Sequence, residues 1–141
     1  MAIPTFQNLT SESGLENRFT ADLRNEFFKS KIIKVVDHTE AEAEIKGTVN
    51  SISNESSAHS EKDLGGVSKI LANQYQAKVN VTILLVRLSD KKVLWQRSLS
   101  SSRQYVTGED VLRNEEKQRE AYTKISSYLM EQMHDLMLED F

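Results

Sequence analysis

The chain has 141 residues, of which 38% are hydrophobic and 28% charged, and a formal net charge of -3 at pH 7. This length and composition predict one folded domain with its own core, and the acidic balance argues against a general nucleic-acid binder. The chain has no cysteine, which excludes disulfides, thiolate metal sites and a cysteine nucleophile, and its longest aliphatic run, residues 83–86, is too short for a membrane-spanning helix.

The first thirty residues predict a short strand followed by a helix. The apolar segment 3–6 fits a strand near a sheet edge, because Pro4 has no backbone N–H to donate to a neighbour. Ser13 and Glu16 have the spacing of a capping box, so we expect a helix over residues 14–29. One side of this helix is apolar at every fourth position, at Leu15, Phe19, Leu23 and Phe27.

Strands are predicted through the middle of the chain. The β-branched run 32–36 favours a minor strand, and apolar residues alternate with polar ones over 41–49, 75–85 and 93–99. Residues 53–68 are polar and rich in turn-forming residues, so we expect them to be a connecting loop.

The last two of these strands form a predicted hairpin whose register depends on its loop. If the loop has an odd number of residues, the core-facing side chains of both strands share one face of the sheet. That set would be Val81, Ile83, Leu85, Val93, Trp95 and Leu99.

Helical spacing returns in the last part of the chain. A second long helix is predicted from residue 109 or 114 to residue 139. Its apolar positions, like those of the first helix, form the face that a two-layer domain must bury in order to fold, so they carry no functional information. They are Ala121, Tyr122, Ile125, Leu129, Met133, Leu136 and Met137.

Patterns typical of catalysis and metal binding are missing from the sequence. The three histidines, His38, His59 and His134, have no metal-ligand spacing, and no serine lies in a nucleophile motif with a histidine base. Gly65-Gly66 lacks the lysine and helix entry of a phosphate-binding loop. Alternating carboxylates at residues 40, 42 and 44 fit a solvated face better than a cation site. We therefore expect no catalytic residue, no metal site and no cofactor.

The turn of the predicted 75–106 hairpin is the candidate interaction site, and we call it the tip. Four apolar residues, Leu84, Val86, Leu88 and Leu94, would lie on the face opposite the core, where no remaining element can obviously cover them. Exposed apolar patches of this kind are typical of partner-binding surfaces. The alternative is that the 53–68 loop partly covers this face.

Cations surround the predicted patch. Arg87, Lys91 and Lys92 border it, and Arg97 and Arg103 follow along the second strand. Cationic side chains of this kind suit a ligand or partner that carries phosphate or carboxylate groups.

The order of these features resembles a known family across essentially the whole chain. The segment from Ile3 to Thr10 followed by residues 14–16 is similar to the first strand and helix entry of the LptE family of lipopolysaccharide-assembly lipoproteins. Residues 41–47 are similar to its second core strand. Leu94-Trp95, Tyr105 and residues 119–121 also fall in the family's order and spacing.

The resemblance implies an α+β fold, a location in the cell envelope and a function in lipopolysaccharide assembly. Two long helices would pack on one face of a mixed, mostly four-stranded sheet, as a two-layer sandwich and a single domain over residues 1–141. The protein would lie on the periplasmic side of the outer membrane of a Gram-negative cell and fill the lumen of the LptD β-barrel. Lipopolysaccharide would pass to the outer leaflet without any catalysis.

The tip would then bind both lipopolysaccharide and the barrel. Arg87, Lys91, Lys92 and Arg97 would bind the phosphates of lipopolysaccharide, and the four apolar residues of the tip would bind the partner. The family's mature proteins begin with an acylated cysteine that this chain lacks, so we expect the lipid anchor upstream of Met1. The alternative function is a periplasmic outer-membrane lipoprotein that acts as an adaptor and regulates a cell-wall enzyme through the same sheet.

Overall fold

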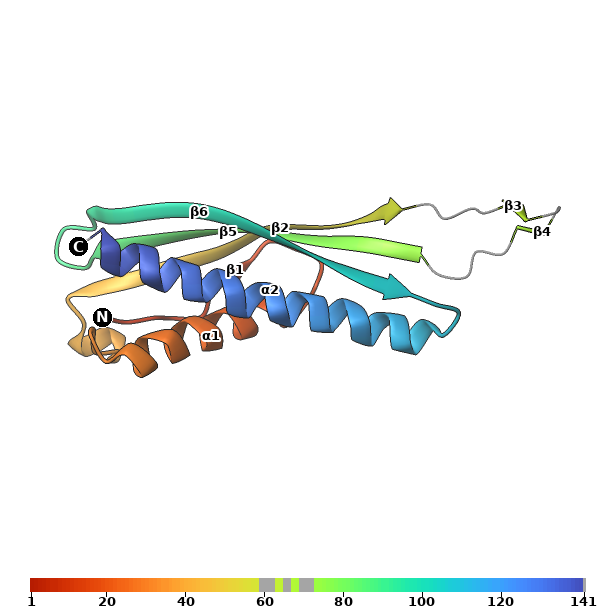
Figure 1. The fold of residues 1–141 in the computed structure, drawn as a ribbon. Coiled ribbons are helices and arrows are strands. Elements are labelled where there is room, and N and C mark those ends of the chain that lie inside the picture. Colours follow the sequence, from red (N-terminus) through yellow and green to blue (C-terminus); the bar gives the residue numbers. More distant parts are fainter. Residues whose placement is uncertain (59–62, 65–66, 69–72, 141) are drawn as a thin grey trace.

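The computed structural model describes residues 1–58, 63–64, 67–68 and 73–140. Its main sheet has the strand order β1-β2-β5-β6, with β1 parallel to β2 and the other neighbours antiparallel. Both helices lie on one side of this sheet (Figure 1), which confirms the two-layer α+β fold. The strands are β1 (Gln7–Asn8), β2 (Ala43–Ala58), β5 (Asn73–Arg87) and β6 (Val93–Thr107), and the helices are α1 (Leu15–Ser30) and α2 (Val111–Glu139).

Helix α1 forms as predicted, with its apolar stripe buried. Leu15, Phe19, Leu23 and Phe27 are all buried against the sheet and α2. The predicted capping box of Ser13 and Glu16 does not form: the N-cap is Gly14, no side chain caps the helix, and the Glu16 carboxylate accepts the Gly14 N–H at 3.0 Å. A second hydrogen bond, from the Asn8 amide at 2.9 Å, ties the same carboxylate to β1.

The N-terminal segment is extended, but its regular strand is shorter and later than residues 3–6. Ala2 forms an isolated parallel bridge with Glu44, and β1 itself pairs with Thr48 and Val49. Ile3 and Phe6 between these points are buried in the core. The segment is held to α1 because the Phe6 N–H donates to the Thr20 hydroxyl at 2.9 Å.

Two other sequence predictions are wrong. Residues 32–36 form no strand, and Ile32 is 68% exposed. The N-terminal segment already occupies the edge of β2, through Ala2 and β1, and the Val36 N–H donates instead to the Met1 carbonyl at 2.9 Å. Residues 53–58 are the end of β2 rather than a loop. Beyond them, β3 (Asp63–Leu64) pairs with β4 (Val67–Ser68), while His59 and Gly65-Gly66 lie outside the described residues. A short 3-10 helix, η1, covers His38–Glu40.

The β5–β6 hairpin has the odd loop that the core pattern requires. Residues 88–92 connect the two strands, and the register pairs Val81 with Leu99 and Leu85 with Trp95. An irregularity next to Leu85 then shifts the pairing by one residue, so that Val86 pairs with Val93. Val93 is 46% exposed, so its predicted place in the core is wrong.

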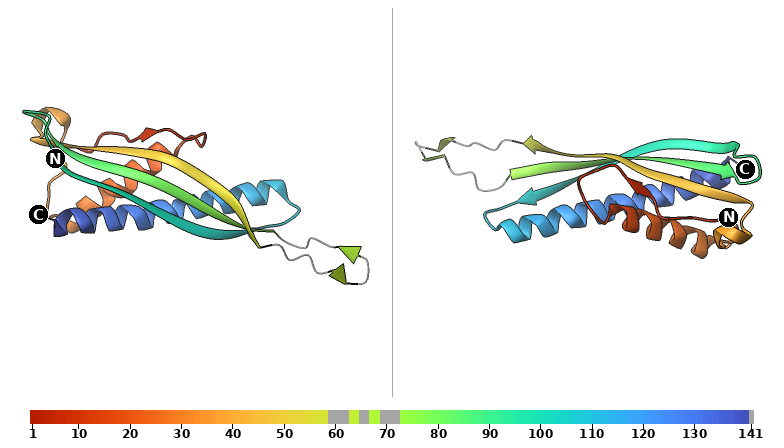
Figure 2. Two further views of the ribbon diagram at one scale, coloured as in Figure 1. Left: turned by 90° about the horizontal axis from the view of Figure 1, so that it is seen from above. Right: turned by 180° about the vertical axis from the view of Figure 1, so that it is seen from behind.

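The two helices cover the sheet unequally. Helix α2 runs almost the whole length of the sheet, while α1 lies only under the half that contains the tip (Figure 2). Under the other half the layer between α2 and the sheet contains a polar network. The Asn54 amide donates to the Tyr122 hydroxyl at 2.6 Å and accepts from the Tyr105 hydroxyl at 2.9 Å, and burial raises the pKa of both tyrosines.

Candidate functional site

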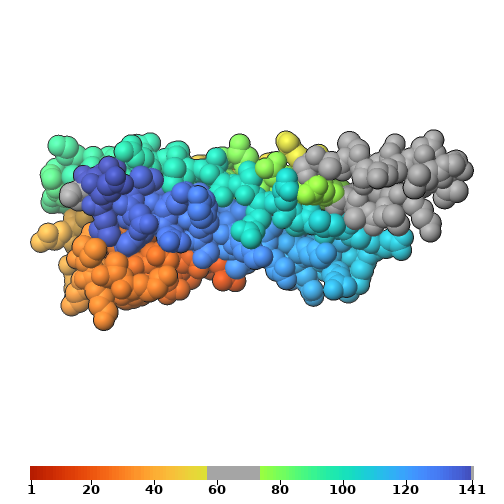
Figure 3. Space-filling view, viewed as in Figure 1, coloured from red at the N-terminus to blue at the C-terminus, as the bar shows by residue number. Residues whose placement is uncertain are grey.

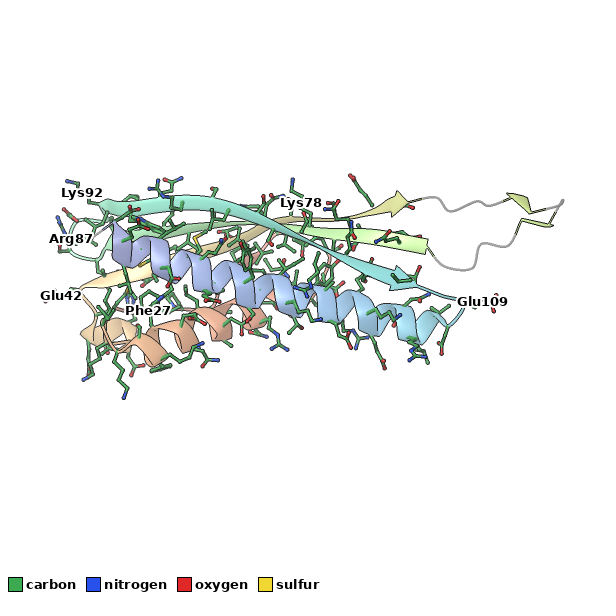
Figure 4. All side chains as sticks on the ribbon, in the orientation of Figure 1. Phe27, Glu42, Lys78, Arg87, Lys92 and Glu109 are labelled. Carbon is green, nitrogen blue, oxygen red and sulfur yellow. The ribbon has the colours of Figure 1, made fainter. Side chains whose placement is uncertain are left out.

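The tip is a tight, hydrogen-bonded turn at one end of the molecule, where Arg87, Lys92 and Glu42 gather (Figure 4). The Arg87 N–H donates to the Lys92 carbonyl at 2.8 Å, and the Leu88 N–H donates to the carbonyl of Glu42 at 3.0 Å. Lys91 has a positive φ of 59°, which an L-residue adopts only at a cost. The hydrogen bonds of the turn hold it in this conformation.

Asp90 organises the cations of this turn. Its carboxylate accepts the Lys92 N–H at 3.2 Å and the Arg87 guanidinium at 3.2 Å. The backbone hydrogen bond from Lys92, together with the nearby Arg87, lowers the pKa of Asp90 from its ordinary value of 3.8. Arg87 is therefore partly neutralised, whereas the side chains of Lys91 and Lys92 have no partner among the described residues.

Arg97 lies farther along β6 and is held by the end of α2. Its guanidinium donates to the Asp140 carboxylate at 3.0 Å, and the same oxygen accepts the Trp95 indole N–H at 2.7 Å. Asp140 thus joins the end of the chain to the strand beneath the tip. The structure brings Arg87, Lys91 and Lys92 together on one turn, and it places Arg97 in a separate ion pair.

The four apolar residues of the tip do not form one exposed patch. Val86 is only 5% exposed, so its predicted place on an uncovered face is wrong. The extra residue at Leu94 changes the register at this point, and Leu94 itself packs partly against the core. Leu88 and Leu94 line a groove of about 660 Å³, and Leu84 is half-buried and pairs with Lys46 and Gln96. The remaining groove residues are Ala41, Glu42, Ala43, Arg87 and Ser89.

The sheet face opposite the helices, which we call the outer face, is polar along most of its length. Hydrogen bonds cross it from Asn50 to Thr82 at 2.7 Å and between Thr82 and Ser98 at 2.8 Å. Lys78, one of its charged residues, points away from the helices (Figure 4). The 53–58 segment extends this face as part of β2 instead of covering it. The polar residues of the outer face include Thr48, Ser51 and Ser53 on β2, Asn80 and Thr82 on β5, and Ser98, Ser100 and Ser102 on β6, and its charged residues include Glu44, Lys46 and Glu55 on β2 and Lys78 on β5.

A second groove lies at the other end of β6, between that strand and α2, and sequence reasoning missed it. It has a volume of about 310 Å³. Its cations come from two elements far apart in the chain: Arg103 from β6, and Lys117 and Lys124 from α2. The only local signal is that Lys117 and Lys124 are seven residues apart, and therefore lie on the same side of a helix.

Two further observations concern metal ligands and membrane-spanning helices. The described residues contain no group of three or more His, Cys, Asp or Glu side chains that could hold a metal ion. Neither described helix has the length and hydrophobicity needed to span a bilayer.

Comparison with known proteins identifies the family. Residues 1–138 match the family model described as LptE, lipopolysaccharide-assembly. No curated protein matches the chain in sequence.

Solved structures support the same fold at low sequence identity. A minor lipoprotein of Acinetobacter baumannii is similar with a TM-score of 0.59 and 10% identity, over 96% of this chain and 92% of that one. A lipoprotein of Neisseria meningitidis is similar with a TM-score of 0.54 and 11% identity, over 73% of this chain and 81% of that one. These likenesses show a shared fold alone. Because the family model covers nearly the whole domain, the chain belongs to the LptE family of lipopolysaccharide-assembly proteins.

Proposed function

We propose that this protein is a non-catalytic outer-membrane assembly factor that fills the lumen of the LptD β-barrel and helps to deliver lipopolysaccharide to the outer leaflet. Membership of the LptE family supports the process and the outer-membrane location. The partner, the periplasmic side of the membrane and an N-terminal lipid anchor are parts of the proposal.

The outer face is the observation that carries this proposal. A sheet face without a covering layer normally meets water or a partner. The middle of this one is an array of hydroxyl and amide groups, with charged residues of both signs toward its ends. The inside of a membrane β-barrel is also polar, because its strands alternate between lipid-facing and lumen-facing residues. A polar sheet can therefore hydrogen-bond to such a wall through its hydroxyl and amide groups. Lys46 and Lys78, which have no partner among the described residues, would each need a polar or acidic partner on that wall.

The tip supplies the proposed contact with lipopolysaccharide. Lys91 and Lys92 are exposed and unpaired among the described residues, so both can bind phosphate groups. Arg87 forms an ion pair with Asp90, and Arg97 forms one with Asp140. To bind a phosphate, each arginine would have to leave its carboxylate partner. Leu84, Leu88 and Leu94 are half-buried and offer some apolar surface beside these cations, whereas Val86 is buried.

Co-purification tests the proposed partner. Full-length, lipidated protein is isolated from detergent-solubilised outer membranes, and the proteins that accompany it are identified. The proposal predicts recovery of the LptD barrel. Recovery of a peptidoglycan synthase without the barrel would favour the adaptor function and contradict the proposal.

Charge reversal tests the tip. Lys91→Glu with Lys92→Glu should weaken lipopolysaccharide binding at low salt, because two attractive contacts become repulsive, and should leave the circular dichroism spectrum unchanged. A double variant at another exposed position, Lys29→Glu with Lys31→Glu, is the control with the same change in charge. Equal binding by the wild type and the tip variant would remove Lys91 and Lys92 from the mechanism.

A further inference from the structure

The groove between β6 and α2 lies along the open edge of the sheet. Strand β6 is the last strand of the sheet order among the described strands, so one side of its backbone has no strand neighbour. Figure 3 views the molecule from the side of this edge, with α2 below it. The groove is lined by four consecutive strand residues, 103–106. Consecutive side chains of a strand point to opposite faces, and a groove that touches all four must therefore run along the edge itself.

The edge offers backbone groups that can bind an extended segment. In an antiparallel sheet, alternate residues of the last strand direct their N–H and C=O groups away from the sheet. An added strand satisfies these groups, and this is a known mode of peptide recognition. The sequence of β6 does little to discourage such pairing, since residues 98–107 carry no proline and a single charged residue, Arg103.

The side chains around the groove determine what kind of segment fits. The groove lining has an excess of positive charge: it contains Arg103, Lys117 and Lys124, and its one acidic residue is Glu120. Among the described residues none of the three cations has a hydrogen-bond or ion-pair partner. Lys117 and Lys124 are two helical turns, or about 10 Å, apart, a distance that roughly three residues of an extended chain cover.

A second copy of the same strand does not meet this requirement. Strand β6 carries Arg97 and Arg103 but no aspartate or glutamate. A second β6 edge would therefore contribute no carboxylate of its own to the three cations, so an acidic strand from another protein fits better.

From these observations we propose that the groove binds an acidic, extended segment of a partner protein, which adds to β6 as a fifth strand. Its backbone pairs with the open edge around residues 103–106, and its carboxylates bind Arg103, Lys117 and Lys124. This site lies at the opposite end of β6 from the tip, eleven residues or about 35 Å from Lys92. The two sites can therefore be occupied and tested independently.

A labelled peptide provides the test. The probe is fluorescein-labelled (Glu-Thr)4, with both ends blocked, and its binding to the full chain is measured by fluorescence anisotropy at low salt. Each exposed ion pair is worth about a two- to fivefold change in affinity. The triple variant Arg103→Gln, Lys117→Gln and Lys124→Gln should therefore bind at least about tenfold more weakly than wild type. The matched control, with the same change in charge at the tip, is Arg87→Gln, Lys91→Gln and Lys92→Gln, and it should bind like wild type.

Two further measurements separate strand addition from simple charge attraction. Binding should slow hydrogen exchange at backbone amides within residues 103–106, and methylation of alternate peptide nitrogens should abolish binding. Pyrophosphate is the probe for a phosphate ligand. The proposal is overturned if the peptide fails to bind, if both triple variants lose equal affinity, if the methylated peptide binds as well, or if pyrophosphate binds more tightly than the peptide.

Discussion

Replacement of Gly47 by alanine tests the contact that joins the N-terminal segment to the sheet. An added Cβ at this position would lie 2.5 Å from two carbons of the Phe6 ring, Cε2 and Cζ. Carbon atoms in contact prefer about 3.5 to 4.0 Å, so the ring would have to move by about 1 Å. The ring has little room to do so, because Phe6 is buried, stacks on Phe19 at 6.5 Å and is fixed at its backbone by Thr20.

The expected loss of stability follows from overpacking. Extra atoms in a tightly packed core cost about 1 to 3 kcal/mol. For a domain of this size, about 2 kcal/mol corresponds to a fall in Tm of roughly 4 to 8 °C. Urea denaturation and a thermal melt followed by circular dichroism measure both quantities.

A matched glycine and a second-site change make the result specific. Gly108→Ala is the control, since an added Cβ there meets no atom within 4 Å. Combining Gly47→Ala with Phe6→Leu should cost less than the sum of the two single losses, because the smaller side chain leaves space for the methyl group. A Gly47→Ala protein as stable as wild type would refute the argument.

The remaining predictions concern three other contacts. Thr20→Val should lower the free energy of unfolding, measured by urea denaturation, by about 1 to 3 kcal/mol, because it removes the acceptor of the buried Phe6 N–H. The control Thr123→Val should change it little, since the Thr123 hydroxyl has no partner among the described residues. Asp140→Ala should shift the emission of the one tryptophan to longer wavelength and cost about 1.5 to 3 kcal/mol, because water replaces the carboxylate that holds Trp95; unchanged emission would contradict this. Hydrogen bonds from the Asn8 amide and from backbone N–H groups lower the pKa of Glu16. The Glu16 carboxylate therefore stabilises the fold at pH values above its ordinary pKa of 4.5, and this stabilisation is lost as the pH falls below that value. Glu16→Gln should therefore flatten the acid side of the stability profile, and an unchanged profile would remove Glu16 from the acid response.

Much of the fold follows from local periodicity. The stripe of α1 and the alternation of β5 predict which residues are buried, because a single face of each element packs on the core. The 53–58 segment was missed because Asn54 is polar yet faces inward. Its partners, Tyr105 and Tyr122, are more than fifty residues away in the chain, so no local pattern reveals them.

The candidate site was less predictable than the fold. The cations of the tip could be read from the sequence, but their ion pairs could not. Arg97 meets Asp140 across 43 residues, and one extra residue in β6 shifts the strand pairing next to Val86, which is buried. The cations of the second groove come from β6 and α2, and only packing brings them together.

Site-specific crosslinking tests the central claim most directly. A photo-crosslinking amino acid replaces Ser100 in the full-length lipidated protein in living cells. Ser100 lies on β6 opposite Asn80 and is exposed on the outer face. The account predicts a light-dependent crosslink to the LptD barrel, since that face should lie against the inner wall. A crosslink to a peptidoglycan synthase, or no crosslink to the barrel from a protein present at normal levels, would contradict it.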